Sequence, residues 1–154
     1  MPPYWLAGYP SGRATFFDGS IVTYLLDTNA ISDLMRGDAR MASWLSSIGV
    51  DDRVAFCTIA RGEILFGLER LAPGPRRTEL EGKAGKLFAV LPCEPIPPAA
   101  GDQYARVKLS QQRRGLPLDE NDLWIAATAL AMDAALVSRD SDFQAIEGLA
   151  VVEP

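Results

Sequence analysis

Four acidic residues, spread over most of the chain, stand where chemistry is common in α/β proteins. Each follows an expected strand or falls in the first turns of an expected helix, and they are Asp27, Glu63, Asp122 and Asp140. In a parallel sheet these positions share one edge, the carboxyl edge at which ligands bind. We therefore expect the four side chains to converge on a single pocket.

Carboxylates gathered in one pocket require a cation. Like charges held close together raise one another's pKa values and destabilise the fold. Mg²⁺ and Mn²⁺ prefer oxygen ligands and would neutralise such a cluster. Clustered acids that hold one or two such ions are typical of phosphodiester hydrolysis, in which one ion activates a water and the other stabilises the leaving oxygen.

Glu63 is the most informative of these acids. Its neighbours three and four positions away on the expected helix are Ile59, Ala60, Phe66 and Gly67, and none can form an ion pair with it. A carboxylate beside an apolar stripe that faces the sheet is costly unless a cation or a proton satisfies it. The alternative is a structural glutamate that is protonated or paired with an arginine.

The aspartates have simpler alternative roles. Asp27 and Asp140 can each cap a helix that begins directly after them. Asp122 stands near the start of a helix that Asp119 is expected to cap, where an acid is favourable without any function. The four positions taken together are more specific than any one of them.

The composition excludes several kinds of active site. The chain has no histidine, so Ser-His-Asp triads, Cys-His pairs and His-ligated zinc sites are excluded. The net charge of −5 argues against a protein that coats DNA non-specifically. Cys57 and Cys93 lack metal-ligand spacing, and we expect buried thiols in a reducing cytoplasm. No apolar run is long enough to span a membrane.

Short apolar segments alternate with amphipathic segments along the chain. We expect strands at 21–26, 54–57, 89–93, 135–137 and 149–152. We expect helices at 29–36, 39–48, 58–71, 76–88, 99–114, 118–132 and 141–146, with Thr58 capping the third. The alternation predicts an α/β fold, a three-layer α/β/α sandwich around a central parallel sheet of roughly four to five strands. Residues 1–20 are expected to be a loosely ordered leader or a start-site artefact, and 21–154 a single domain.

Four motifs, in order along the chain, resemble the successive signatures of PIN-domain ribonucleases. They are Leu26-Asp27-Thr28-Asn29, Glu63-Ile64-Leu65-Phe66-Gly67, Asn121-Asp122-Leu123-Trp124-Ile125-Ala126-Ala127-Thr128-Ala129 and Val137-Ser138-Arg139-Asp140-Ser141-Asp142-Phe143. From about Val22 onward the chain is most similar to the VapC toxins of bacterial type II toxin–antitoxin pairs. The resemblance implies that 21–154 is a PIN-like nuclease domain.

The resemblance also implies an activity, that of a Mg²⁺-dependent endoribonuclease with Mn²⁺ as a substitute. Asp27, Asp122 and Asp140 would hold the principal metal ion. Glu63 would orient the attacking water or help to bind a second ion, and Asp142 is an additional candidate ligand. We expect the products to carry a 5′-phosphate and a 3′-hydroxyl.

Supporting residues and partners follow from the same resemblance. Thr28 and Ser138 would support the site, and Asn29 would brace the loop around Asp27. The expected partners are an RNA substrate, a cognate VapB-type antitoxin and a second copy of the chain, in the cytoplasm and without a membrane. Candidates for a docking surface are Phe66 and Leu68. Basic candidates for binding RNA phosphates are Arg76, Arg77, Lys83, Lys86, Arg113 and Arg114.

Other protein classes fit the pattern less well. A haloacid-dehalogenase-like phosphatase needs a second acid two residues after the first, where this chain has Asn29. A phosphorelay receiver domain needs a late lysine, yet none follows Lys108. A catalytically silent interaction domain would be expected to lose acids, and all four are present. A non-toxin PIN-domain housekeeping nuclease stays open as an alternative.

Overall fold

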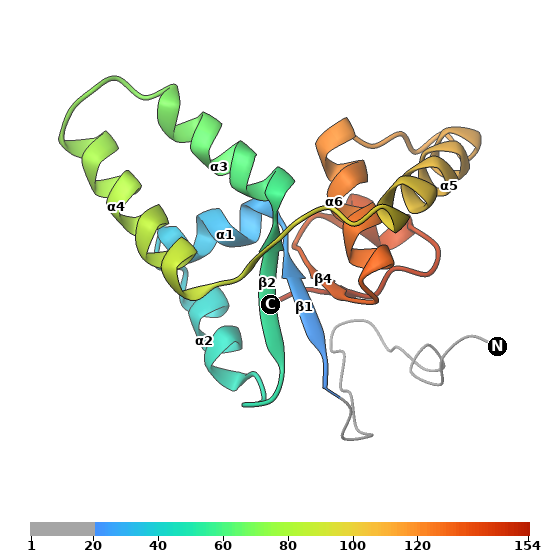
Figure 1. The fold of residues 1–154 in the computed structure, drawn as a ribbon, viewed down its shortest axis with the longest axis horizontal. Coiled ribbons are helices and arrows are strands. Elements are labelled where there is room, and N and C mark those ends of the chain that lie inside the picture. The colour runs from blue at the N-terminus through green and yellow to red at the C-terminus, as the bar shows by residue number, and fades with distance from the viewer. Residues whose placement is uncertain (1–20) are drawn as a thin grey trace.

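One parallel β-sheet lies at the centre of the structure, a computed structural model that describes residues 21–154 (Figure 1). Its strands are β1 Thr23–Leu26, β2 Arg53–Cys57, β3 Cys93–Glu94, β4 Ala135–Val137 and β5 Val151–Val152. They pair in the order β3-β2-β1-β4-β5. The strand order therefore reverses between β1 and β4, which is where open α/β sheets bind ligands. The leader expected at 1–20 lies outside the described residues.

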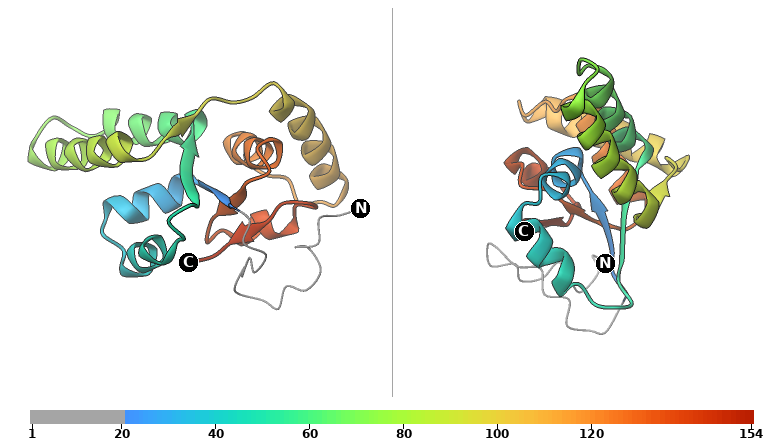
Figure 2. Two further views of the ribbon diagram at one scale, coloured as in Figure 1. Left: turned by 60° about the horizontal axis from the view of Figure 1, so that its bottom comes forward. Right: turned by 90° about the vertical axis from the view of Figure 1, so that its left-hand side faces the viewer.

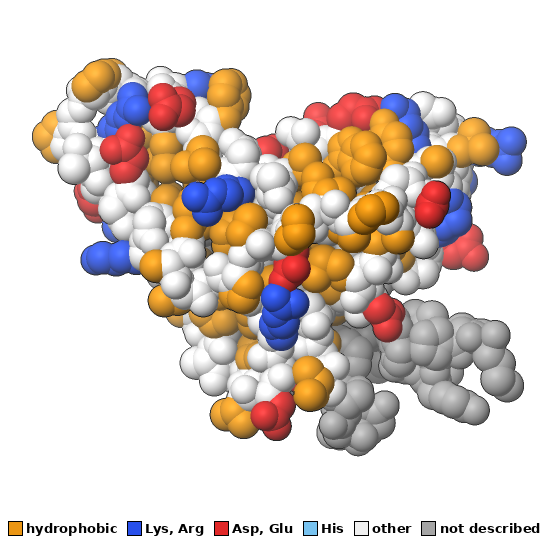
Figure 3. All heavy atoms as spheres, viewed as in Figure 1, with side chains coloured by type: hydrophobic (Ala, Val, Ile, Leu, Met, Phe, Trp, Pro, Cys, Tyr) orange, Lys and Arg blue, Asp and Glu red, His pale blue; other side chains and the backbone are white. Residues whose placement is uncertain are grey.

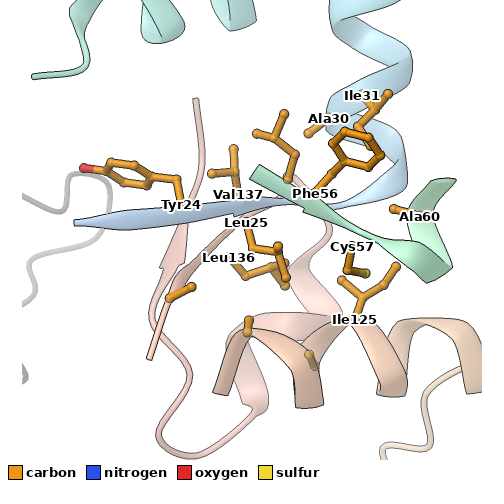
Figure 4. Close-up of a cluster of buried hydrophobic side chains, with 14 of the residues drawn as sticks. Tyr24, Leu25, Ala30, Ile31, Phe56, Cys57, Ala60, Ile125, Leu136 and Val137 are labelled. Atoms are coloured by element: carbon orange, nitrogen blue, oxygen red, sulfur yellow. The ribbon is translucent and has the colours of Figure 1, made fainter. Parts of the chain in front are cut away.

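Helices cover both faces of this sheet. They are α1 Thr28–Met35, α2 Ala39–Ser47, α3 Thr58–Glu69, α4 Pro75–Val90, α5 Ala99–Arg113, α6 Glu120–Ala131 and the short 3₁₀ helix η2 Ser141–Ala145. Figure 4 shows Phe56 beside Ile31 of α1 on one face, and Leu136 and Cys57 toward Ile125 of α6 on the other. The predicted three-layer α/β/α fold is confirmed.

The central strand β1 is buried on both sides, as its apolar run predicts. Leu25 and Leu26 have no exposed surface. Leu25 pairs in register with Ala55 of β2 and with Leu136 of β4, so it packs within a continuous apolar layer. The first polar residue after the run, Asp27, is thereby delivered to the carboxyl edge of the sheet.

The strand expected at 89–93 is wrong, because α4 continues through Val90. Phe88, near the end of this helix, stacks on Phe56 of β2 with ring centroids 5.0 Å apart. The helix continues past Phe88, and Leu91 N–H still donates to Leu87 C=O. Strand β3 begins only at Cys93, after Pro92.

Two smaller expectations around β2 and β3 are also corrected. Cys57, not Thr58, is the N-cap of α3, since β2 runs into the helix without a loop. The Thr58 hydroxyl donates instead to Glu94 C=O at 3.2 Å. Cys57 is buried as expected, whereas Cys93 on the edge strand β3 is exposed.

Helices α3 and α4 form a hairpin that projects from the body of the molecule (Figure 2). Arg77 fastens its far end, with Nε 2.6 Å from Glu81 on α4 and Nη2 3.3 Å from Glu69 on α3. Within residues 21–154, no helix is both long enough and apolar enough to cross a membrane.

Candidate active site

The carboxyl ends of β1 and β4 lie side by side and carry two of the predicted acids. Leu26 and Val137 are paired, and Asp27 N–H donates to Val137 C=O at 3.2 Å. Asp140 follows three residues after Val137. In Figure 1 this edge of the sheet points into the gap between α3 and α6, and Figure 3 shows the surface hollowed there between the α3–α4 hairpin and the α5–α6 lobe.

Asp27 is a buried carboxylate, with 3% of its surface exposed. It caps α1, because its Oδ1 accepts a hydrogen bond from Ala30 N–H at 2.7 Å. Burial raises the pKa of Asp27, hydrogen bonds from Ser138 and Ala30 lower it in part, and the charges of Asp140 and Asp33 raise it further. Asp27 can therefore cap α1 and belong to the acidic site at the same time.

Glu63 reaches the same pocket from the second turn of α3. Its Oε1 accepts a hydrogen bond from the Thr28 hydroxyl at 2.6 Å, across 35 residues of sequence. The contact ties α3 to the first residue of α1. The partner that Glu63 lacks on its own helix is thus supplied by the residue directly after Asp27.

Asp122 lies in the first turn of α6, after the predicted cap Asp119, which accepts a hydrogen bond from Asn121 N–H at 2.9 Å. The pKa of Asp122 is raised from 3.8 to about 6, mainly by burial and in part by the charges of Asp119, Glu63, Asp140 and Asp27. The last three are the other members of the predicted set. The fold therefore brings all four acids close enough for their charges to interact.

Asp140 is fixed by the turn that begins the 3₁₀ helix. Its Oδ1 accepts from Asp142 N–H at 2.9 Å, and its own N–H donates to Ser138 Oγ at 3.0 Å. Ser138 is buried, at 1% exposure, and also hydrogen-bonds Asp27, so it links the two acids. Asp142 is exposed, whereas Asp140 is among the charges that raise the pKa of both Asp27 and Asp122.

Some predicted supporting residues lie elsewhere. Asn29 is exposed on the first turn of α1, and its bracing of Asp27 stays a prediction. Phe66 is 64% exposed on α3, but Leu68 is 7% exposed and packs in the core, so Leu68 is wrong as a docking residue. It follows Ile64 by four residues on the helix face that covers the sheet, which explains its burial.

The basic candidates for RNA binding divide into two groups. Three have partners within the protein: Arg77 pairs with Glu69 and Glu81, Lys83 pairs with Glu79 at 3.0 Å, and Arg114 donates to Ala145 C=O. The others are exposed, namely Arg76, Lys86 and Arg113. Their role in RNA binding stays a prediction.

The donor set suits a hard divalent cation, since it consists of carboxylate oxygens with a hydroxyl beside them. Among residues 21–154, no three acidic or cysteine side chains are yet arranged as ligands of one ion. Ionised carboxylates repel one another, so an ion would be needed to draw them together. The other three acids help to raise the pKa of Asp122. Such repulsion between carboxylates is what a bound cation would relieve.

Sequence reasoning missed a set of charged residues beside this pocket. Arg139 contacts Asp33 and Asp38, which lie about a hundred positions earlier in the chain. Asp33 also raises the pKa of Asp27. No local sequence pattern connects segments so far apart. The one sequence feature that could have pointed to Arg139 is its place in the fourth motif, directly before Asp140.

Comparison with known proteins agrees with the fold. The PIN domain family matches residues 24–149. Ribonuclease VapC1 of Haemophilus influenzae (strain R2866) is 30% identical over 131 residues, which are 82% of this chain and 93% of that protein. Toxin FitB of Neisseria gonorrhoeae (strain ATCC 700825 / FA 1090) is 31% identical over 139 residues, 84% of this chain and 96% of that protein.

A solved structure of VapBC-1 from nontypeable Haemophilus influenzae superposes with a TM-score of 0.76 at 25% identity. The match covers 86% of this chain and 98% of that chain. The family match begins within β1 and ends just before β5. The chain belongs to the PIN-domain family and, within it, to the VapC-type proteins.

Proposed function

We propose that this protein is a metal-dependent endoribonuclease, a VapC-like toxin that a cognate antitoxin inhibits. The proposal rests on the surroundings of Asp122. The charges of Glu63, Asp140 and Asp27 are among the causes that raise its pKa. The charges of the other three acids, which come from three other segments, reach Asp122 beside the switch point of a parallel sheet, and this supports the proposal. The relatives named Ribonuclease VapC1 and Toxin FitB support the same activity and role.

The four acids share two tasks in the proposed reaction. Asp27, Asp122 and Asp140 would hold the principal ion, Mg²⁺ or Mn²⁺, which supplies charge neutralisation and an acidified water when bound. Glu63 would orient the attacking water or share a second ion, and the Thr28 hydroxyl holds its carboxylate in place. Ser138 and Ala30 fix Asp27, so its oxygens need not reorganise during the reaction.

The proposed partner is a VapB-type antitoxin. The solved structure to which this chain is similar is of VapBC-1, and this supports the assignment. On this chain the projecting α3–α4 hairpin exposes Phe66, together with Leu65 at 40% exposure. We place the protein in the cytoplasm and expect it to form a dimer. A small neighbouring gene that encodes a protein with a DNA-binding N-terminus would favour a toxin over a housekeeping nuclease.

The direct test is cleavage of end-labelled RNA by the purified protein. Mg²⁺ or Mn²⁺ should support cleavage, and excess chelator should abolish it in a way that added metal reverses. The fragments should carry 5′-phosphate and 3′-hydroxyl ends. Full activity in chelator, or products with 2′,3′-cyclic phosphate ends, would remove the proposed mechanism.

Thr28→Val tests how Glu63 is oriented. The substitution keeps the shape of the side chain and removes the hydroxyl that donates to Glu63 Oε1. We expect kcat for RNA cleavage to fall about tenfold, because losing a group that orients a metal-site residue has effects of this order. Thr78→Val is the matched control, since the Thr78 hydroxyl donates to Gly74 C=O at the far end of the hairpin. An equal fall in both variants would contradict the assignment.

A further inference from the structure

Arg139 links two residues of the site to a distant part of the fold. It stands between Ser138 and Asp140, directly after β4. Its guanidinium reaches the connection between α1 and α2, where Nη2 donates to Asp38 Oδ1 at 2.7 Å and Nη1 to Asp38 Oδ2 at 3.3 Å. Nη1 also donates to Asp33 Oδ2 at 3.4 Å.

The far end of this link is held by a helix cap. Asp38 caps α2, with its Oδ1 accepting from Met41 N–H at 2.9 Å. Hydrogen bonding from Arg139 is the main cause of the lowered pKa of Asp38, so the carboxylate stays ionised. Two charge-assisted hydrogen bonds in a fork fix orientation as well as distance. Arg139 is thus fastened to a helix start.

The position of the Arg139 guanidinium also carries a cost in folding free energy. Within residues 21–154, Arg139 Nε is a buried side-chain nitrogen without a hydrogen-bond partner. Burying an unpaired donor costs free energy. The protein tolerates this unpaired donor in an arrangement that also forms the two hydrogen bonds from Arg139 to Asp38.

The near end of the link is the site itself. Asp140 N–H donates to Ser138 Oγ at 3.0 Å, and Asp27 N–H donates to Val137 C=O at 3.2 Å. The segment from Val137 to Asp140 is therefore tied to β1 on one side and, through Arg139, to the α1–α2 connection on the other.

We propose that Arg139 is a positioning residue, which anchors the segment after β4 and thereby holds Asp140 in place beside Asp27. The inference rests on the proposed function, because it assigns Asp140 a metal ion to hold. It adds Arg139, Asp38 and Asp33 to the residues on which the site depends.

If charge alone mattered, removing Arg139 would change the affinity for a divalent ion in the opposite direction from that expected for a positioning residue. Taking a cation away from an acidic cluster strengthens its attraction for a divalent ion. Loosening Asp140 weakens the binding of that ion, because ligand orientation depends on surrounding contacts. The direction of the change in metal affinity therefore separates positioning from electrostatics.

The experiment is a titration of the protein with Mn²⁺, without RNA, in which electron paramagnetic resonance measures free Mn²⁺. Arg139→Met is expected to bind Mn²⁺ about tenfold more weakly than the wild type. Arg36→Met is the matched control, because Arg36 pairs with the same Asp33 but lies at the end of α1 with 65% of its side chain exposed. Its Mn²⁺ affinity is expected to be unchanged or slightly higher.

Asp38→Asn supplies a second, independent variant. Asparagine still caps a helix, so α2 keeps its start while the ionic fork to Arg139 is lost. We expect weaker Mn²⁺ binding, and we expect the double variant with Arg139→Met to bind no more weakly than Arg139→Met alone.

Four outcomes would overturn the inference. Wild-type affinity or tighter binding in Arg139→Met contradicts positioning, as do additive effects in the double variant, which indicate charge alone. If Arg139→Met does not fold, wild-type Mn²⁺ affinity in Asp38→Asn has the same meaning. Absence of Mn²⁺ binding by the wild type overturns the proposed function and this inference together, whereas failure in the variants alone leaves the proposed function standing.

Discussion

Asp27→Asn is expected to lower the rate of RNA cleavage by about 10³-fold or more, a loss of about 4 kcal/mol of transition-state stabilisation. The neutral amide is a poor ligand for a hard cation, and Asp27 is the most buried of the four acids. The fold should survive, because asparagine caps helices as well as aspartate does and can accept from Ala30 N–H. Metal-free thermal stability should rise slightly, since a buried charge is removed.

Two variants accompany Asp27→Asn. Asp119→Asn makes the same change at the exposed cap of α6 and should keep activity within about twofold. Asp27→Ala should be as inactive as Asp27→Asn but less stable, by roughly 0.5–2 kcal/mol, because the cap is lost. Circular dichroism and RNA cleavage measure both properties, and near-wild-type cleavage by Asp27→Asn would contradict the mechanism.

Asp122→Asn should abolish metal-supported cleavage and also change how stability depends on pH. The folded protein raises the pKa of Asp122 to about 6, so the native state holds its proton more tightly than the unfolded chain does. Metal-free stability therefore falls as the pH rises from about 4 through 6. Asparagine removes this loss, and the variant should be more stable than the wild type at about pH 8 but not below about pH 4.

The size of this stability difference is modest because Asp122 is only half-buried. We expect about 1 kcal/mol after allowing for solvent screening, which corresponds to a rise in Tm of roughly 2–4 °C at about pH 8. Thermal scans in chelator at both pH values measure it. Added Mn²⁺ should stabilise the wild type and leave Asp122→Asn nearly unchanged. A variant that is less stable at both pH values would contradict the crowding of charge around Asp122.

Local signals in the sequence were sufficient for much of the fold. Asp119 was predicted as the cap of α6, and Ala135–Val137 as a strand, because each depends on residues close by in the chain. The four acids were predicted to converge because the carboxyl ends of parallel strands share one edge. That step needs only the strand–helix alternation and the positions of the acids within it.

The errors came from contacts between distant segments. Helix α4 continues to Val90 and packs Phe88 against Phe56 of β2, a contact that the apolar run from Ala89 does not reveal. The partner of Glu63 is Thr28, and no helical spacing relates the two. Arg139 and Asp38 are 101 residues apart, so their ion pair exists only once the sheet has formed. The sequence indicated Thr28 as a supporting residue, but it did not reveal that Thr28 bonds Glu63 or that Arg139 bonds Asp38.

Under the proposed function, the strand order β3-β2-β1-β4-β5 has a consequence for when the nuclease becomes active during protein synthesis. The ribosome makes β1 first and β4 near the end, yet the two strands are neighbours. A nascent chain that stops before β4 has Asp27 and Glu63 but lacks Ser138, Arg139 and Asp140. Under the proposed function, such a chain cannot cut RNA while it is still on the ribosome. On that proposal, the antitoxin is needed only after the segment that carries β4 and Asp140 has been made.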